Sequence, residues 1–168
     1  EVESAPGSGT VFRISFPRVE APAAPARPGA APAPMDGRGT TVLLVEDDPA
    51  VLEIVRAILS ASGFEVLAAR TPREAIPLAR MHRDRIRLLV SDVVMPEMSG
   101  RELADLLRAS MPGLPCLFMS GYPADALTRG GILDVGVYFL EKPFTRAAFD
   151  AKLRSVLAAP PAPPDGTT

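Results

Sequence analysis

The most informative stretch of the sequence runs from Leu88 to Gly100, where an apolar segment ends abruptly at Asp92 and a loop with Pro and Gly follows. The residues before Asp92 are typical of a strand that is buried on both faces. Asp92 is then expected at the carboxyl end of that strand, where parallel sheets carry their ligand sites. A carboxylate in this place is a metal ligand, a nucleophile, or the cap of the following turn.

Four more polar residues that could do chemistry also follow apolar runs. They are Glu46 and Asp47 after one run, Ser120 after a second and Lys142 after a third. Three carboxylates that meet at one sheet edge would repel one another, by about 4 kcal/mol for each pair at 4 Å in a surface-like dielectric. A divalent cation that prefers oxygen ligands, such as Mg²⁺, and the Lys142 ammonium would offset that repulsion. The hydroxyl and the ammonium would then suit a bound phosphoryl group, with a carboxylate as the nucleophile.

The segments that must position these side chains alternate between strand-like and helix-like patterns. The expected strands are residues 41–45, 64–68, 88–91, 115–119 and 137–140. The expected helices are 49–62, one from residue 72, one from about 100 to 109, a weak one over 122–130, and one from about 146 to 157. Strand followed by helix five times predicts an α/β fold, a five-stranded parallel doubly wound sheet flanked by helices. The strand order 2-1-3-4-5 is taken from the flavodoxin-like class and is not worked out from the residues.

The helix ends and faces carry further expectations. Asp48 is expected to cap the first helix, and capping-box patterns open the second helix at Thr71 and the third at Ser99. Thr145 is expected to cap the last helix. Pro77 should shorten or bend the second helix, because proline in a regular helix interior costs about 3 kcal/mol. The expected buried positions are Val51, Ile54, Val55, Ile58 and Leu59 in the first helix, and Phe149, Leu153 and Leu157 in the last.

The length and composition of the chain limit the classes of protein to which it can belong. With 168 residues the chain can hold one ordinary domain with a proper core and short appendages. The formal net charge of −2 gives no reason to expect binding of nucleic acid. No apolar run approaches the roughly 18 residues of a membrane span, and the amino end is too polar for a signal peptide. We therefore expect a cytoplasmic location without direct membrane contact, in a parent that could be membrane-anchored. The single cysteine, Cys116, fits a reducing compartment and a buried core position.

The two ends of the chain differ in composition from the middle. Residues 1–17 hold a Gly-rich turn and one alternating strand over residues 11–16, whose partner sheet we expect upstream because one strand cannot form a domain. Residues 18–40 are expected to be a Pro/Ala-rich linker, and residues 159–168 a disordered tail. Because the chain starts at Glu1 without Met, we expect a piece of a longer protein.

The amino-terminal stretch resembles the closing strand of the ATP-binding domain of sensor histidine kinases. The matching residues are Pro6, Gly7, Gly9, Thr10, Phe12, Ile14 and Pro17.

From residue 41 to residue 157 the sequence resembles a receiver domain of two-component signalling. The matching pieces are Leu-Val-Glu46-Asp47-Asp48-Pro, Ser-Asp92-x-x-Met95-Pro96-x-Met98-x-Gly100, Met-Ser120-Gly121 and Phe139-x-x-Lys142-Pro143-Phe144. Each piece alone is a weak signal, but all of them in this order at strand ends are a strong one. The resemblance also implies a cis peptide bond between Lys142 and Pro143.

The resemblance implies roles for the acidic residues and a cofactor. Asp92 would accept a phosphoryl group from a histidine, with Mg²⁺ bound beside it. Asp47 is the better candidate for a direct metal ligand. Glu46 replaces the family's frequent Asp and could act through water. Asp92 itself and the backbone carbonyl of Val94 would complete the metal site.

The same resemblance implies a switch and a slow decay. Ser120 would bond a phosphoryl oxygen, and Lys142 would pair with the phosphoryl charge. Movement of Ser120 would let Phe139 turn inward and change the surface made by the fourth helix, the fifth strand and the fifth helix. Val94 and Tyr122, which border the path of attacking water in this family, would shield the acyl phosphate. We therefore expect slow self-dephosphorylation.

The whole pattern predicts the carboxyl-terminal part of a hybrid sensor histidine kinase. Its partner would be a phosphohistidine donor, either a kinase dimerisation domain or a histidine phosphotransfer protein. No kinase activity is expected in this piece, because the nucleotide-binding elements would lie upstream. One alternative is an interaction module that takes no phosphate, which is disfavoured because every site residue type is present. Another is a phosphohydrolase with an aspartyl nucleophile, but such enzymes usually carry a second acid two residues later, where this chain has Val94.

Overall fold

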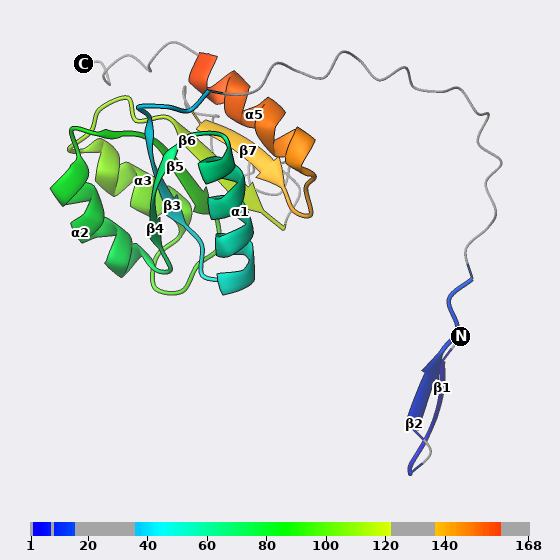
Figure 1. The fold of residues 1–168 in the computed structure, drawn as a ribbon. Helices are drawn as coiled ribbons and strands as arrows, with labels where there is room; N and C mark the ends of the chain where they lie inside the picture. The colour runs from blue at the N-terminus through cyan, green and yellow to red at the C-terminus, as the bar shows by residue number, and fades with distance from the viewer. Residues whose placement is uncertain (1, 8, 16–35, 122–136, 159–168) are drawn as a thin grey trace, which may run out of the picture. The chain divides into compact units, whose positions relative to one another are not determined.

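The structure is a computed structural model that describes residues 2–7, 9–15, 36–121 and 137–158 (Figure 1). The chain divides into two units, residues 1–33 and residues 34–168. The predicted helix over 122–130, the tail over 159–168 and most of the linker over 18–40 lie outside the described residues. Within the described ranges, no helix has both the length and the apolar character needed to cross a membrane.

The larger unit alternates strands and helices along the chain, as predicted. Its elements are β3 (Thr41–Val45), α1 (Pro49–Ala61), β4 (Glu65–Ala69), α2 (Pro72–His82), β5 (Ile86–Asp92), α3 (Gly100–Arg108), β6 (Cys116–Ser120), β7 (Val137–Glu141) and α5 (Arg146–Ala158). The five strands form one parallel sheet in the order β4-β3-β5-β6-β7. Counted within this unit, that order is 2-1-3-4-5, so the predicted flavodoxin-like sheet is confirmed.

The strand register brings the carboxyl ends of the central strands to one edge of the sheet. Val45 of β3 lies opposite Ser91 of β5, and Asp92 lies opposite Met119 of β6. β5 begins at Ile86, two residues earlier than predicted, and ends at Asp92 itself. The side chains that follow these strands therefore gather at the same edge.

Two apolar cores lie on opposite faces of the sheet. Leu43 and Val45 of β3 belong to the core that includes α2 and α3, whereas Val42 and Leu44 belong to the core that includes α1 and α5. Figure 1 shows these two pairs of helices on opposite sides of the sheet. Because both faces are covered, β3 is buried at every position, which explains why its sequence is apolar without alternation.

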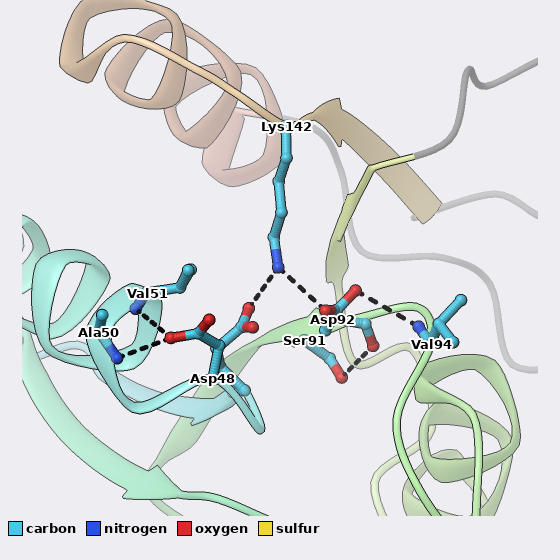
Figure 2. Close-up of polar contacts among 8 residues, drawn as sticks. Asp48, Ala50, Val51, Ser91, Asp92, Val94 and Lys142 are labelled. Atoms are coloured by element: carbon cyan, nitrogen blue, oxygen red, sulfur yellow. Dashed lines mark hydrogen bonds and ion pairs between the residues drawn. The ribbon is translucent and has the colours of Figure 1, made fainter. Parts of the chain in front are cut away.

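Side-chain caps fix the helices that begin near the site edge. The Asp48 carboxylate accepts hydrogen bonds from the backbone N–H groups of Ala50 at 2.8 Å and Val51 at 3.2 Å, as Figure 2 shows. Ser99 and Glu102 form both halves of the predicted capping box at the start of α3. An N-cap of this kind contributes about 1 kcal/mol, and these two caps also hold the loops that follow β3 and β5.

Helix α2 differs from its prediction in two ways. Thr71 accepts the N–H of Glu74 at 3.2 Å, as a capping box requires. The Glu74 carboxylate accepts the N–H of Arg70 at 2.8 Å, where a capping box would use the N–H of Thr71. The helix also continues through Pro77 to His82, so Pro77 does not shorten it, and the alternative of a bent helix stays a prediction. Pro77 lacks the N–H that would bond the carbonyl of Arg73, and because both residues are exposed, water can bond that carbonyl instead.

The buried face of α1 is shifted from the predicted one. Leu52, Val55 and Leu59 are buried, whereas Ile54 is 58% exposed. Successive helical residues are about 100° apart, so Ile54 lies about 200° around the helix from Leu52 and faces solvent. The prediction missed Leu52 because it followed the apolar spacing 51, 54, 55, 58 and 59, which lies to one side of the buried stripe at 52, 55 and 59.

Helix α5 shows the same kind of shift at its end. The predicted cap is present, since Thr145 accepts the N–H of Ala148 at 3.2 Å. Val156 is buried, whereas Leu157, which was expected in the core, is 40% exposed. The other two predicted core residues of this helix, Phe149 and Leu153, are buried.

The amino-terminal unit contains a hairpin, which corrects the prediction for this segment. β1 (Val2–Ala5) pairs antiparallel with β2 (Gly9–Phe12), so the strand ends at Phe12 and its partner lies in the chain itself. The turn between them uses Gly7 and Gly9 at a φ of 80°, which favours glycine. Every described residue of this unit is exposed, and an isolated two-stranded hairpin is marginally stable at best in water.

Candidate functional site

The side chains predicted to do chemistry come from four neighbouring strands of the sheet. Glu46 and Asp47 follow β3, Asp92 is the last residue of β5, Ser120 is the last residue of β6 and Lys142 follows β7. Since these strands are parallel, their ends share one edge. The structure brings the three acids together there and bonds Lys142 to two of them, from positions up to 96 residues apart in the chain.

Lys142 is shared between two carboxylates. Its Nζ donates to Oε2 of Glu46 at 2.7 Å and to Oδ2 of Asp92 at 2.9 Å. Figure 2 shows the lysine side chain reaching toward Asp92 from the end of β7. The side chains of Lys142, Asp92 and Glu46 are 20%, 15% and 1% exposed, so water screens these ion pairs only in part.

The acidic residues form a group that suits a small divalent cation. Glu46, Asp47 and Asp92 each offer one carboxylate oxygen, and these oxygens all lie within 4.8 Å of one another. Asp47 and Asp92 are half-buried, which leaves the solvent side of the group open. A few hard oxygen donors beside open positions fit Mg²⁺, which keeps several of its waters when bound to proteins.

The pKa values of Glu46 and Lys142 are both raised, although burial acts on them in opposite directions. Burial raises the pKa of the Glu46 carboxyl, the neighbouring charge of Asp92 adds to this rise, and the bond to Lys142 opposes it. For Lys142, burial alone would lower the pKa, but the hydrogen bonds and charges of Glu46 and Asp92 together leave the pKa raised. The lysine therefore keeps its positive charge at neutral pH, where it offsets the repulsion between the acids.

The loop after Asp92 holds that residue through its backbone. The N–H of Val94 donates to Oδ1 of Asp92 at 3.3 Å, and the hydroxyl of Ser91 donates to the carbonyl of Asp92 at 2.8 Å. The predicted metal contact of the Val94 carbonyl stays a prediction. Sequence reasoning missed the part played by Ser91, although a serine inside an otherwise apolar run was a visible signal.

Gly100 lets helix α3 approach the end of β5. Its N–H donates to the carbonyl of Val93 at 3.0 Å. A Cβ at this position would lie 2.0 Å from the carbonyl oxygen of Asp92 and 2.8 Å from Oγ of Ser91. The side chain of any other residue would therefore collide with the backbone that carries Asp92. The motif in the sequence includes Gly100, but the sequence alone does not show why glycine is needed there.

The two predicted switch residues lie in β6 and β7. Ser120 is 2% exposed at the end of β6, and its carbonyl accepts the N–H of Lys142 at 2.7 Å, which ties the ends of the two strands together. Phe139 is half-buried, with its ring centroid 5.6 Å from that of Phe118. The Lys142–Pro143 bond is cis, as the resemblance implied. The roles of Ser120 and Phe139 in a switch stay predictions.

Comparison with known proteins agrees with this fold and this arrangement of residues. Residues 42–154 match the model of the response regulator receiver domain. This match covers more than half of the chain, and the chain therefore belongs to the receiver domain family.

Individual relatives point to the same family. Over 163 residues, the chain is 36% identical to the sensor kinase CckA of Brucella abortus, in a match that covers 92% of the chain and 17% of that kinase. It is 34% identical over 122 residues to a probable transcriptional regulatory protein, TcrX, of Mycobacterium tuberculosis, of which it covers 51%. The chain thus spans about half or less of the length of these relatives.

Solved structures resemble the larger unit. The receiver domain of a hybrid histidine kinase, CckA, aligns with a TM-score of 0.60 and 33% identity, over 70% of this chain and 98% of that one. A response regulator receiver protein from Sinorhizobium medicae aligns with a TM-score of 0.64 and 27% identity, over 72% of this chain and 96% of that one. In both cases the solved chain is covered almost completely, so the likeness concerns a whole receiver domain.

Proposed function

We propose that this chain is a phosphoacceptor of a two-component phosphorelay, in which Asp92 takes a phosphoryl group from a phosphohistidine. The observation that carries the proposal is the placement of Asp92, whose carboxylate is bonded to the Lys142 ammonium and has an oxygen within 4.8 Å of oxygens of Asp47 and Glu46. A nucleophilic carboxylate, a fixed cation and a group of metal-binding oxygens are the parts that phosphoryl transfer needs.

Each residue has a distinct role in the proposed transfer. An oxygen of Asp92 forms the new P–O bond while the P–N bond to the donor histidine breaks, and the leaving imidazole takes up a proton. Lys142 meets the charge on the phosphoryl oxygens, and Ser120 offers its hydroxyl to one of them. Mg²⁺, held by Asp47, Asp92 and the Val94 carbonyl with Glu46 beside them, would supply charge stabilisation for those oxygens when bound.

The proposed parent is a hybrid sensor histidine kinase, of which this chain is the carboxyl-terminal part. The match to the Brucella abortus sensor kinase supports this, because it covers 92% of the chain whereas the receiver model covers only residues 42–154. The fourteen residues after 154 are too few to account for the additional length, so the match includes residues before 42. Residues 1–17 would then close an ATP-binding domain, and residues 18–40 would link it to the receiver.

The proposed partner and location follow from this parent. The phosphoryl donor would be the histidine of a kinase dimerisation domain or of a histidine phosphotransfer protein, in the cytoplasm. Nucleic acid is not a proposed partner, because the chain has a formal net charge of −2.

Beryllofluoride with Mg²⁺ tests the proposal directly, since it mimics a phosphoryl group on a carboxylate. We expect one equivalent to bind to the wild-type protein and none to Asp92→Asn, measured by fluorine NMR and calorimetry. Absence of binding to the wild type would favour an interaction module that takes no phosphate. Turnover of simple phosphate esters would favour a phosphohydrolase.

The lifetime of the phosphorylated form tests the environment of Asp92. Val94 is two residues after Asp92 and its side chain is 59% exposed, so it can cover the approach of water to the acyl phosphate. We expect slow loss of phosphate from the wild type and faster loss from a Val94→Asn, Tyr122→Glu variant. A variant that decays no faster than the wild type would contradict this shielding role.

A further inference from the structure

A hollow lies at the edge of the sheet opposite the acidic residues. Its volume is about 730 Å³, and its lining includes the start of β5, the loop between α3 and β6, and the end of α5. The strands are parallel, so the start of β5 and its last residue, Asp92, lie at opposite edges of the sheet. The hollow is therefore separate from the candidate site around Asp92.

The deeper part of the hollow is apolar. Ile86 of β5, Leu114 of the loop and Val156 of α5 line it and are buried. Leu157 lies beside them in the lining, with 40% of its surface exposed. An exposed apolar side chain that continues a buried apolar surface is a place where a further apolar segment can pack.

The rim of the hollow carries more positive than negative charge. Arg83 and Asp84 form an ion pair at 3.5 Å and so offset each other. Arg87 donates to the carbonyl of Ile86 at 3.2 Å, and it has no ion pair with an acid among the residues that the structure describes. A guanidinium in this position suits a carboxylate. The hollow as a whole therefore fits an occupant with an apolar body and one acidic group.

The segment of the chain that follows α5 has this chemistry. α5 ends at Ala158, the residue after Leu157, so the segment begins beside the hollow. Residues 159–168 hold prolines at positions 160, 161, 163 and 164, and Asp165 is their only charged residue. An extended proline-rich segment advances about 3.1 Å per residue, so Asp165 can lie up to about 22 Å from Ala158.

The covalent connection also favours this segment over a separate molecule. A short tether keeps its free end at an effective concentration in the millimolar range, so even weak contacts lead to binding. Proline-rich segments are already extended before they bind, and they lose little conformational freedom on binding.

We infer that residues 160–165 dock into this hollow, with the proline rings against Leu114 and Leu157 and the Asp165 carboxylate paired with Arg87. The composition of residues 159–168 cannot supply a core of its own, so the order of the segment would come from the surface of the larger unit. The inference concerns an interaction surface and does not depend on phosphoryl transfer at Asp92.

A nitroxide label in the segment measures docking in the full chain. Thr167→Cys supplies one reactive thiol, because Cys116 is buried. We expect the label to broaden the amide NMR signals of Arg87 and Gly113 and to leave that of Val94, at the opposite edge, unchanged. Equal broadening at both edges, or no broadening at Arg87, would overturn the inference.

Substitutions in the segment distinguish docking from the mere nearness of a tethered label. Serine at positions 160, 161, 163 and 164 removes the proline rings but leaves every helix and strand of the described structure intact. We expect the broadening at Arg87 to fall at least threefold in this variant. Broadening as strong as in the labelled chain with all four prolines would overturn the inference.

Charge reversal tests the pairing of Asp165 with Arg87. Arg87→Glu should lower the ratio of docked to undocked chains about threefold, the size expected for an exposed ion pair, and adding Asp165→Arg should restore it. Arg73→Glu is the matched control, because it makes the same change at an exposed arginine at the start of α2, outside the hollow. Equal losses in Arg87→Glu and Arg73→Glu, or no recovery in the double variant, would overturn the pairing.

A mixture of two samples tests whether a second copy of the chain is the occupant. One sample carries the nitroxide without isotope enrichment, and the other is enriched and unlabelled, so only contacts between copies cause broadening. We expect no broadening at Arg87 in the mixture. Broadening there as strong as within the labelled chain would show that the hollow binds the segment of another copy, and would overturn the inference.

Discussion

The larger unit and the amino-terminal hairpin use apolar side chains in opposite ways. Leu44 in β3 has no exposed surface, whereas Phe12 in β2 is 69% exposed. β3 pairs with a strand on each side and is covered by helices on both faces, while β1 and β2 form a separate two-stranded sheet. An apolar pattern therefore predicts a strand, but whether that strand is buried depends on the strands and helices that pack around it.

Truncation of one apolar side chain in each unit should give the largest contrast. Leu44→Ala removes buried atoms from the core that includes α1 and α5, and should lower the free energy of unfolding by about 3 kcal/mol. Phe12→Ala removes an exposed ring and should change it by less than about 0.5 kcal/mol. Urea unfolding of both variants measures the two values, and a loss in Phe12→Ala as large as that in Leu44→Ala would show that the hairpin packs against something.

A methyl group added at Gly100 should cost nearly as much. Its Cβ would lie 2.0 Å from the Asp92 carbonyl oxygen, so the start of α3 or the end of β5 must shift, at about 2–3 kcal/mol. Gly121→Ala is the control for stability, since no atom of the described residues lies within 4 Å of the position its Cβ would take. Thermal unfolding of the two variants should differ clearly, and equal stabilities would mean that the approach of α3 to Asp92 is looser than described.

Alkaline pH should weaken the larger unit through Cys116. Burial raises the pKa of this thiol from 9.0 to about 11. The folded state therefore holds the thiol proton more tightly than the unfolded chain, and the stability it contributes is present below the unfolded pKa and is lost as pH rises toward the folded one. Between about pH 8 and pH 11 the wild type should lose about 2 kcal/mol more than Cys116→Ala does.

Urea unfolding of both proteins across that range checks the prediction for Cys116. Comparison with the alanine variant cancels the contribution of lysine and tyrosine groups that titrate in the same range. Parallel pH dependence in the two proteins would show that the thiol is not buried in the folded state.

The smallest effect is expected at the cap of α1. Asp48→Ala removes the acceptor of the Ala50 and Val51 N–H groups and should cost about 1 kcal/mol. Asp84→Ala is the control, because that acid is 89% exposed and caps no helix of the structure described here. If the two variants lost the same stability in urea, the cap would contribute no more than a surface charge.

The sequence predicted the parallel sheet, its helices and the gathering of Glu46, Asp47, Asp92 and Lys142, because buried strands and strand-end residues leave strong local patterns. It failed where the outcome depended on contacts between distant segments. The pairing of β2 with Val2–Ala5 was missed, since four exposed residues with little apolar alternation carry no strand signal. The exposure of Ile54 and Leu157 was missed because the spacing of apolar residues does not fix how a helix is rotated against the sheet.

Some features of the site were also beyond the sequence. The direct bond between Glu46 and Lys142 depends on side-chain length and burial, which become known only when β3 and β7 are placed on the same sheet. The role of Gly100 depends on how closely α3 approaches Asp92, a distance that no local pattern encodes.

The most direct test of the account is to phosphorylate the chain with acetyl phosphate and Mg²⁺ and to locate the modification by peptide mass spectrometry. We expect one phosphoryl group per chain, on Asp92, that disappears in Asp92→Asn and on removal of Mg²⁺ with a chelator. A chain that takes up no phosphoryl group, or that carries it on a residue other than Asp92, would contradict the account.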